Sequence, residues 1–219
     1  MAVDNSQPRY EFRIWGNHLS PLRDRIAATA SPSVPRESAE TYILSAATDT
    51  ANVKVRAGLL DIKLMVEQQG RLERWRPALK TPFPVDSRTI VEDVFPDLKI
   101  APPHIERPSY THGEFIRDLV RPHHDLTAVD VIKRRSTFEI DQCKAEFAEV
   151  EIAGGASSET LELESEDPAA VLRAIAKFGL TAYPNISKFG LTAYPNISYV
   201  RHLKLMIGMI PRTIGTVAN

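Results

Sequence analysis

Several stretches of this chain alternate polar and apolar residues with a period of two, which predicts β-strands that have two different faces. In residues 9–15, Tyr10, Phe12 and Ile14 share one face, opposite Arg9, Glu11, Arg13 and Trp15. Similar segments separated by turn signals lie at residues 40–46, 51–56, 60–68, 71–77, 127–138, 142–152 and 159–164. This series of strands predicts an α+β chain built on an eight-stranded antiparallel β-barrel with flanking helices.

Helix signals separate some of these strands. Ser20 and Asp167 are N-cap residues, and each is followed by a proline at the first helical position. We predict helices over residues 20–29, 83–95, 111–120 and 168–177. In a closed barrel such helices would cover the outside, and the polar strand faces would then line the interior.

The segment 177–187, Lys-Phe-Gly-Leu-Thr-Ala-Tyr-Pro-Asn-Ile-Ser, is followed by an identical copy at 188–198. Solenoid repeats are longer and need at least three units, so this is a tandem duplication inside one fold. Its Gly and Pro prevent either copy from simply lengthening a helix. We therefore treat residues 1–219 as a single domain in which one copy sits in the fold and the other loops out or displaces it.

The charges nearly cancel, with 27 Lys and Arg against 28 Asp and Glu and a net charge of −1. The chain as a whole therefore attracts neither a nucleic-acid duplex nor an anionic membrane, and we expect neither as a partner. The single cysteine, Cys143, is typical of a reducing compartment, and no apolar run reaches the ~18 residues of a membrane helix. We expect a cytoplasmic protein and leave a homodimer open.

Charges of one sign recur on single faces of the predicted strands. Lys54 pairs in this way with Arg56 and Lys133 with Arg135, whereas Glu162 pairs with Glu164. One interpretation is the ordinary solvated face of an antiparallel sheet. If the charges face inward, the cations would neutralise phosphate oxygens and the glutamates would hold Mg²⁺ or Mn²⁺.

His123, His124 and Asp125 also suggest a metal site. Two adjacent histidines in a strand point to opposite faces and cannot bind one ion without a turn. Because the spacing of typical ligands is missing, we predict a polar loop here.

The ordered series of charged segments resembles the CYTH superfamily, the triphosphate tunnel metalloenzymes. The similar segments span nearly all of the chain, at residues 10–15, 53–56, 60–63, 132–135, 145–150, 161–164 and 199–204. The resemblance implies an eight-stranded tunnel in which basic side chains bind a triphosphate-containing small molecule or another polyanion. It also implies that glutamates hold Mg²⁺ or Mn²⁺.

The resemblance, taken with the strand faces, assigns roles to individual residues. Residues implied in catalysis are Glu11, Lys63 and Arg135. Residues implied in metal binding are Glu11, Glu149 (with Glu146 as its alternative), Glu162 and Glu164. Residues implied in substrate binding are Arg13, Lys54, Arg56, Lys63, Arg74, Arg76, Lys133, Arg135, Arg201 and Lys204.

The first strand departs from the family pattern. Members of the family have Glu-x-Glu-x-Lys there, whereas this chain has Glu11, Arg13 and Trp15. An arginine in place of a glutamate repels a divalent ion. Two functions therefore stay open: a metal-dependent phosphohydrolase of inorganic or organic triphosphate with an impaired motif, and a non-catalytic protein that binds polyphosphate, a nucleotide or another anion. A structural barrel with solvated charges is the third alternative.

Overall fold

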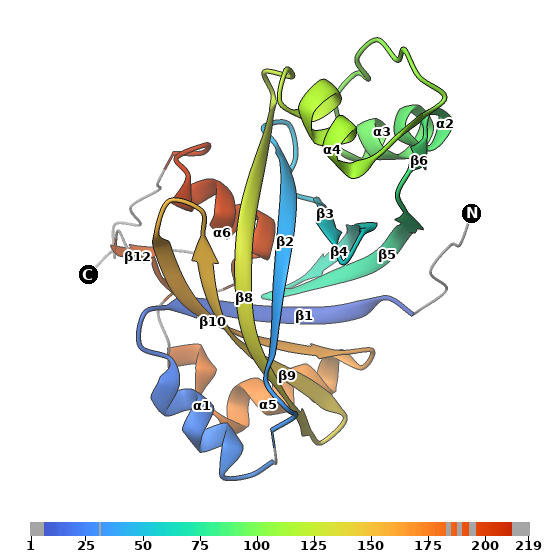
Figure 1. Cartoon of the computed structure of the whole chain (residues 1–219). Coiled ribbons are helices and arrows are strands. Elements are labelled where there is room, and N and C mark those ends of the chain that lie inside the picture. The colour runs from blue at the N-terminus through green and yellow to red at the C-terminus, as the bar shows by residue number, and fades with distance from the viewer. Residues whose placement is uncertain (1–6, 31, 183–184, 188–189, 193–195, 212–219) are drawn as a thin grey trace.

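Eight antiparallel strands close into a barrel in the computed structural model (Figure 1). The structure describes residues 7–30, 32–182, 185–187, 190–192 and 196–211. The barrel strands are β1 (Arg9–Gly16), β2 (Arg36–Ser45), β3 (Ala51–Arg56), β4 (Leu59–Gln69), β5 (Leu72–Pro82), β8 (Leu126–Ile140), β9 (Cys143–Ile152) and β10 (Ala156–Ser165). Their order is β1-β10-β9-β8-β2-β3-β4-β5, and β5 pairs with β1 to close the ring. The predicted α+β architecture with an eight-stranded barrel is confirmed.

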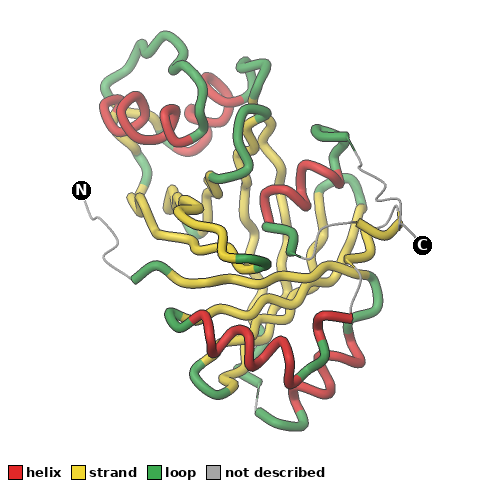
Figure 2. The backbone as a smooth tube through the Cα atoms, turned by 180° about the vertical axis from the view of Figure 1, so that it is seen from behind, coloured by secondary structure: helices red, strands yellow, loops and turns green. Residues whose placement is uncertain are grey.

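Helices flank the barrel in separate groups, which Figure 2 shows from behind. The helical elements are α1 (Ser20–Ala27), α2 (Ser87–Thr89), η1 (Ile90–Val94), α3 (Phe95–Asp97), α4 (His112–Glu114), η2 (Phe115–Val120), α5 (Pro168–Lys177), η3 (Leu180–Ala182) and α6 (Tyr199–Met206). Two small sheets pair β6 (Val85–Asp86) with β7 (Ser109–Tyr110), and β11 (Asn185–Ser187) with β12 (Gly190–Thr192). Among the described helices, none has the length and apolar character needed to cross a bilayer.

The predicted helices form with adjusted ends. Helix α5 has the predicted bounds, and α1 ends two residues early. The helical turns predicted from residue 83 begin only at Ser87, because the Asp86 side chain accepts a hydrogen bond from the Thr89 backbone N–H at 2.8 Å. An aspartate in that position marks the start of a helix rather than its interior.

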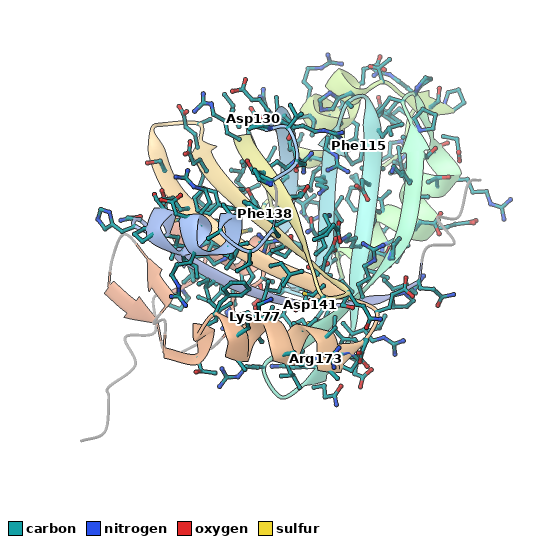
Figure 3. The ribbon with its side chains drawn as sticks, turned by 90° about the horizontal axis from the view of Figure 1, so that it is seen from below. Phe115, Asp130, Phe138, Asp141, Arg173 and Lys177 are labelled. Carbon is teal, nitrogen blue, oxygen red and sulfur yellow. The ribbon has the colours of Figure 1, made fainter. Side chains whose placement is uncertain are left out.

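The outer faces of the barrel strands are apolar where helices cover them. Phe12 and Leu161 pack with Leu22 of α1 and Val171 of α5 in one cluster. Figure 3 shows α5 from below with Arg173 and Lys177, and the Lys177 ammonium lies 3.0 Å from the Asp141 carboxylate in the β8–β9 turn.

A second outer cluster lies beneath the helical segment of residues 87–120. Val53 and Ile62 of the barrel pack there against Phe95 and Phe115. Because two apolar layers lie outside the barrel, the opposite, largely polar strand faces point into it.

Helix α6 packs against inward-facing residues and closes one end of the barrel interior. Leu203 and Val200 of α6 form an apolar cluster with Trp15, Leu44 and Val131, which belong to three barrel strands. The barrel interior is therefore apolar at the α6 end and charged further along.

Residues from both copies of the duplicated segment pack against the rest of the fold. Phe178 and Leu180 of the first copy are buried in the cluster beneath α5. At the end of the second copy, Asn196 accepts a hydrogen bond from the Arg13 N–H at 2.8 Å, and Ser198 caps α6. The prediction that one copy sits in the fold while the other loops out or displaces it falls in part on residues 183–184, 188–189 and 193–195, which lie outside the described residues.

We predict that a chain without residues 188–198 folds, with a free energy of unfolding within about 1 kcal/mol of the full chain or higher. One copy can supply both the residues equivalent to Phe178 and those equivalent to Asn196, since β11 already lies beside β1. Urea unfolding of the two chains measures the difference. A shortened chain that fails to fold would mean that both copies are needed.

Candidate functional site

A charged cavity of about 200 Å³ lies inside the barrel. Among the described residues, seven Lys and Arg side chains line it: Arg13, Lys54, Arg56, Lys63, Lys133, Arg135 and Lys144. Its carboxylates are Glu11, Asp61, Glu146, Glu162 and Glu164. The structure thus brings together Glu11, Lys63 and Arg135, the three residues for which the sequence analysis expects a catalytic role.

These charges do not lie on a solvated surface. The side chains of Lys54, Lys133 and Arg135 are only 11%, 5% and 19% exposed. They alternate along their strands with residues of the outer face, as the period of two requires. The alternative of a solvated sheet face does not hold for this set.

Glu40 of β2 lies beneath the basic part of the cavity, and its side chain is 0% exposed. Its carboxylate lies 3.6 Å from the Lys54 ammonium, 3.7 Å from Arg56 and 3.9 Å from Arg135, and it accepts a hydrogen bond from the Tyr42 hydroxyl at 2.9 Å. Burial opposes its ionisation, but Lys54 and its neighbours lower the pKa of Glu40 to about 2. Glu40 is therefore the shared counter-ion of three cations.

Glu146 of β9 holds the next pair of cations. Its carboxylate lies 3.8 Å from Lys133 and 3.7 Å from Arg135. Burial lowers the pKa of Lys133 to about 8, although Glu146 and Glu40 act against this shift. An anionic ligand beside Lys133 would favour its charged form.

Three carboxylates gather in the other part of the cavity. Oxygens of Glu11, Glu162 and Glu164 all lie within 4.8 Å of one another. Two strands supply them, because Glu11 pairs with Glu164 across β1 and β10 while Glu162 lies two residues further along the same face. Such a group of carboxylate oxygens is the donor set that Mg²⁺ or Mn²⁺ prefers.

Cations already occupy this donor set. A guanidinium nitrogen of Arg13 lies 2.5 Å from a Glu162 oxygen, and Lys63 lies 3.0 Å from Glu11. Glu164 accepts from Lys144 at 2.7 Å. Because arginine keeps its proton under all ordinary conditions, a divalent ion would have to displace Arg13 or bind beside its charge. The paired cations therefore disfavour a divalent ion at this group.

The pKa values of Glu11 and Glu162 are shifted in opposite directions. Burial raises the pKa of Glu11 to about 8, with Glu162 adding to the effect and Lys63 opposing it. Burial also disfavours the charge of Glu162, but Arg13 overcomes this and holds the pKa of Glu162 well below its usual range. At neutral pH, Glu162 is thus the charged partner of Arg13.

Some residues expected at the site lie outside the cavity. Glu149 is exposed on the outer face of β9, because it lies an odd number of residues from the inward-facing Glu146. Its expected metal role is therefore not supported, and Glu146 is the cavity residue of that strand.

Arg74 and Arg76 flank the cavity residue Trp75, so both point away from the interior. Arg74 lies 3.3 Å from Glu67, and Arg76 donates to the Pro77 carbonyl. Neither lines the cavity, and their expected role in substrate binding is not supported.

Arg201 and Lys204 are on α6 and contact the β2–β3 turn. Lys204 lies 2.6 Å and Arg201 3.5 Å from carboxylate oxygens of Asp49. Neither is among the residues that line the cavity. Their charges hold the helix to the barrel, which is a structural role that differs from the predicted substrate contact.

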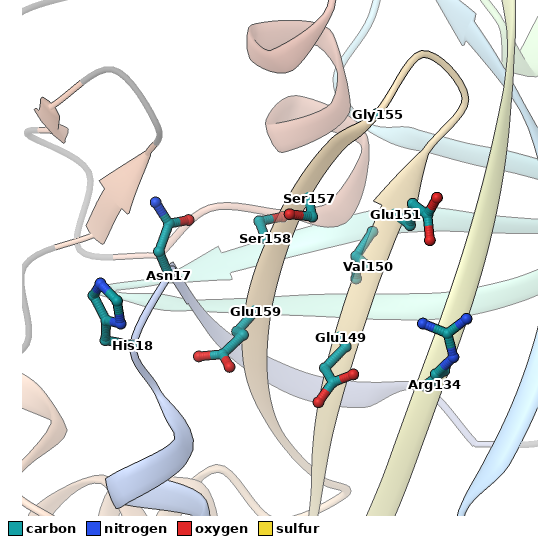
Figure 4. A pocket seen from close by; sticks show the side chains of 10 residues that line it. All are labelled: Asn17, His18, Arg134, Glu149, Val150, Glu151, Gly155, Ser157, Ser158 and Glu159. Atoms are coloured by element: carbon teal, nitrogen blue, oxygen red, sulfur yellow. The ribbon is translucent and has the colours of Figure 1, made fainter.

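A larger hollow of about 540 Å³ lies on the outside of the barrel over β8, β9 and β10 (Figure 4). Its charged side chains include Glu149, Glu151 and Glu159 but only one arginine, Arg134. Glu159 already accepts hydrogen bonds from the Leu19 backbone N–H and the Ser20 hydroxyl. This surface therefore lacks the positive charge that an anion needs.

His123, His124 and Asp125 lie in a turn, which brings their donor atoms within 4.8 Å of one another. The expected polar loop is present, and its turn removes the restriction that a strand would impose on two adjacent histidines. The His124 side chain is 86% exposed and already lies 3.1 Å from Asp125.

Glu40, Lys144 and Tyr199 also belong to the site, although they are not among the residues expected there from the sequence. Lys144 shares a strand face with Glu146, so parity could have found it, whereas no charge was identified on the strand of Glu40 that would have marked its face. Tyr199 belongs to α6, and only the packing of that helix into the barrel brings it to the cavity.

No family model matches the sequence, and no curated protein matches it. Among solved structures, the PH1819 protein of Pyrococcus horikoshii OT3 is 13% identical, covers 90% of this chain and 99% of its own, and has a TM-score of 0.44. A conserved hypothetical protein of Pyrococcus furiosus is 13% identical, with coverages of 87% and 98% and a TM-score of 0.43. The PH1012 protein of Pyrococcus horikoshii OT3 is 12% identical, with coverages of 87% and 97% and a TM-score of 0.41. Similarities this remote carry no argument about activity.

We predict that Glu40→Gln destabilises the protein by ~3 kcal/mol at pH 7 and by less at pH 3. The folded-state pKa of Glu40, about 2, lies below the ordinary glutamate value of 4.5. Its contribution is therefore fully present above pH 4.5 and is lost as the pH falls toward 2. Urea unfolding at the two pH values measures the change.

Glu37→Gln is the matched control, because Glu37 lies on the same strand with a side chain that is 60% exposed. We expect it to change the free energy of unfolding little at either pH. If Glu40→Gln had the same effect at both pH values, Glu40 would not be the buried counter-ion described above.

Proposed function

We propose that this chain binds a short polyanion of the triphosphate class inside the barrel. The observation that carries the proposal is the set of seven Lys and Arg side chains around one cavity, counted among the described residues. Lys and Arg are the usual ligands of phosphate oxygens, because they supply charge and several hydrogen-bond donors.

The energetic cost of burying these charges supports a functional role. Taking an ion out of water costs several kcal/mol, and ion pairs inside a protein often only offset that cost. An apolar core would stabilise a barrel of this size better than Arg13, Lys54 and Lys133 with their counter-ions. Clusters of buried ionisable groups of this kind are typical of binding and catalytic sites.

The cavity also has a basic mouth. A neighbouring hollow of about 210 Å³ shares Arg56, Lys63 and Glu164 with the cavity and adds Arg9 and Lys80. Cations that continue from the mouth into the interior would attract an elongated anion and guide it inward. A linear polyphosphate, or the phosphate chain of a nucleotide, has this shape and charge.

Binding without turnover fits the site better than hydrolysis. Triphosphate hydrolysis of the kind that the sequence resemblance implies relies on carboxylate-bound metal. In this chain Arg13 pairs with Glu162 at 2.5 Å in the middle of the carboxylate group. Arg13 supplies a fixed positive charge there, which itself favours a phosphate oxygen.

One observation favours the second candidate, a metal-dependent triphosphatase. The oxygens of Glu11, Glu162 and Glu164 are close enough to share an ion. This candidate requires Mg²⁺ or Mn²⁺ to compete successfully with Arg13 and Lys63.

We predict that the protein binds inorganic tripolyphosphate without added metal and that Arg135→Ala weakens binding about tenfold, as the loss of one charged hydrogen-bond donor would. Isothermal titration calorimetry measures the affinity. Arg134→Ala is the matched control, because Arg134 lies on the outer face of the same strand and pairs with Glu37. Equal affinities of the two variants would contradict the assignment of the interior as the binding site.

We predict that Mg²⁺ or Mn²⁺ produces no phosphate release from tripolyphosphate above the rate of a Glu162→Gln/Glu164→Gln variant. Release is measured over time with folded protein at saturating ligand. Metal-dependent release that disappears in the double variant would replace binding by hydrolysis as the function of the cavity.

A further inference from the structure

The α6 end of the cavity is sealed by stacked aromatic rings. The Trp15 ring lies 3.6 Å from the His202 ring and is nearly parallel to it, and the Trp15 indole N–H donates to the Ile197 carbonyl. The Tyr42 and Tyr199 rings stack at 4.9 Å. A ligand that passes the basic mouth therefore meets Tyr199 at the closed end.

The hydroxyl of Tyr199 is a buried polar group that the protein does not satisfy. The residue is 4% exposed and lines the cavity, and its hydroxyl has no hydrogen-bond partner within the described part of the chain. A buried donor without a partner costs roughly 1–3 kcal/mol, so such groups call for an explanation.

Tyr42, whose ring stacks on that of Tyr199, differs in the hydrogen bonding of its hydroxyl. The hydroxyl of Tyr42, also buried, donates to the Glu40 carboxylate at 2.9 Å. Both phenols lie in the same stack, but only the Tyr42 hydroxyl has a protein acceptor. Within the described part of the chain, the Tyr199 hydroxyl thus lacks the acceptor that the Tyr42 hydroxyl has.

Two cations, each paired with a carboxylate of the cavity, lie over the Tyr199 ring. The Lys133 ammonium lies 4.3 Å from the ring centroid, and the Arg13 guanidinium carbon lies 5.2 Å from it. Burial raises the pKa of the Tyr199 phenol well above its usual value, so the group stays a proton donor at physiological pH. One neutral donor and two cations together match an end group with several anionic oxygens.

We propose that Tyr199 is the inner end contact of the ligand, and that its hydroxyl donates a hydrogen bond to an oxygen of the terminal phosphoryl group of a linear polyphosphate that enters end first. This inference rests on the proposed function and adds its specificity. The site then selects ligands with a free terminal phosphoryl group, whether that group belongs to inorganic tripolyphosphate or to a nucleoside triphosphate.

The test compares Tyr199→Phe with Tyr42→Phe, since each variant removes a single oxygen from the same stack. We expect Tyr199→Phe to weaken tripolyphosphate binding about tenfold in calorimetry while its melting temperature stays equal or rises. We expect Tyr42→Phe to lower the melting temperature, because it removes the hydrogen bond to Glu40. A comparable fall in melting temperature for Tyr199→Phe would show a structural hydroxyl and overturn the proposal.

The choice of ligands tests the end group. Cyclic trimetaphosphate has no terminal phosphoryl group, so Tyr199→Phe should leave its affinity unchanged while weakening tripolyphosphate and ATP. The relative affinities of tripolyphosphate and ATP distinguish the inorganic from the nucleotide source. An equal loss for the cyclic ligand would overturn the role of the terminal group.

Failure of this inference is distinguishable from failure of the proposed function. If Arg135→Ala weakens tripolyphosphate binding and Tyr199→Phe does not, the cavity binds the anion but Tyr199 is not its end contact. If the folded wild-type protein binds none of the three ligands, the proposed function itself is overturned.

Discussion

The arrangement of the interior depends on Glu40, whose buried carboxylate is shared by Lys54, Arg56 and Arg135. Cations this close together repel one another strongly where the dielectric is low. Glu40 offsets this repulsion, and Arg56 and Arg135 have Asp61 and Glu146 as further counter-ions. The barrel is therefore folded around a partly neutralised charge cluster rather than around an apolar core.

The charged interior of the barrel determines where its apolar residues lie. Since the strand faces that point inward carry the charges, the opposite faces have to be covered from outside, and α1, α5 and the 87–120 segment cover them. Only the α6 end of the interior is apolar, and there Trp15 and Leu203 pack as in an ordinary core. The helices are thus a necessary part of a barrel with a charged interior.

Strand alternation allowed most of the fold to be predicted from the sequence, together with the inward cations Lys54, Lys133 and Arg135. The same rule could not assign β5 correctly, because an alternating strand does not show which of its faces is inside, and Arg74 and Arg76 proved to be outside. Contacts that depend on how a helix packs could not be predicted from the sequence either. Arg201 and Lys204 bind Asp49, and Tyr199 lines the cavity, only because α6 packs into the barrel end.

Because the end of the cavity beneath α6 is closed, any ligand would have to enter and leave through the same opening. A tunnel open at both ends lets a molecule pass through, whereas the α6 end of this cavity is occupied by the stacked rings of Trp15 and His202. For a ligand bound as proposed, the end that enters first would leave last, and the trailing part of a longer ligand would lie at the mouth beside Arg9 and Lys80. Such a cavity can hold the tip of a chain of any length without enclosing the rest of it.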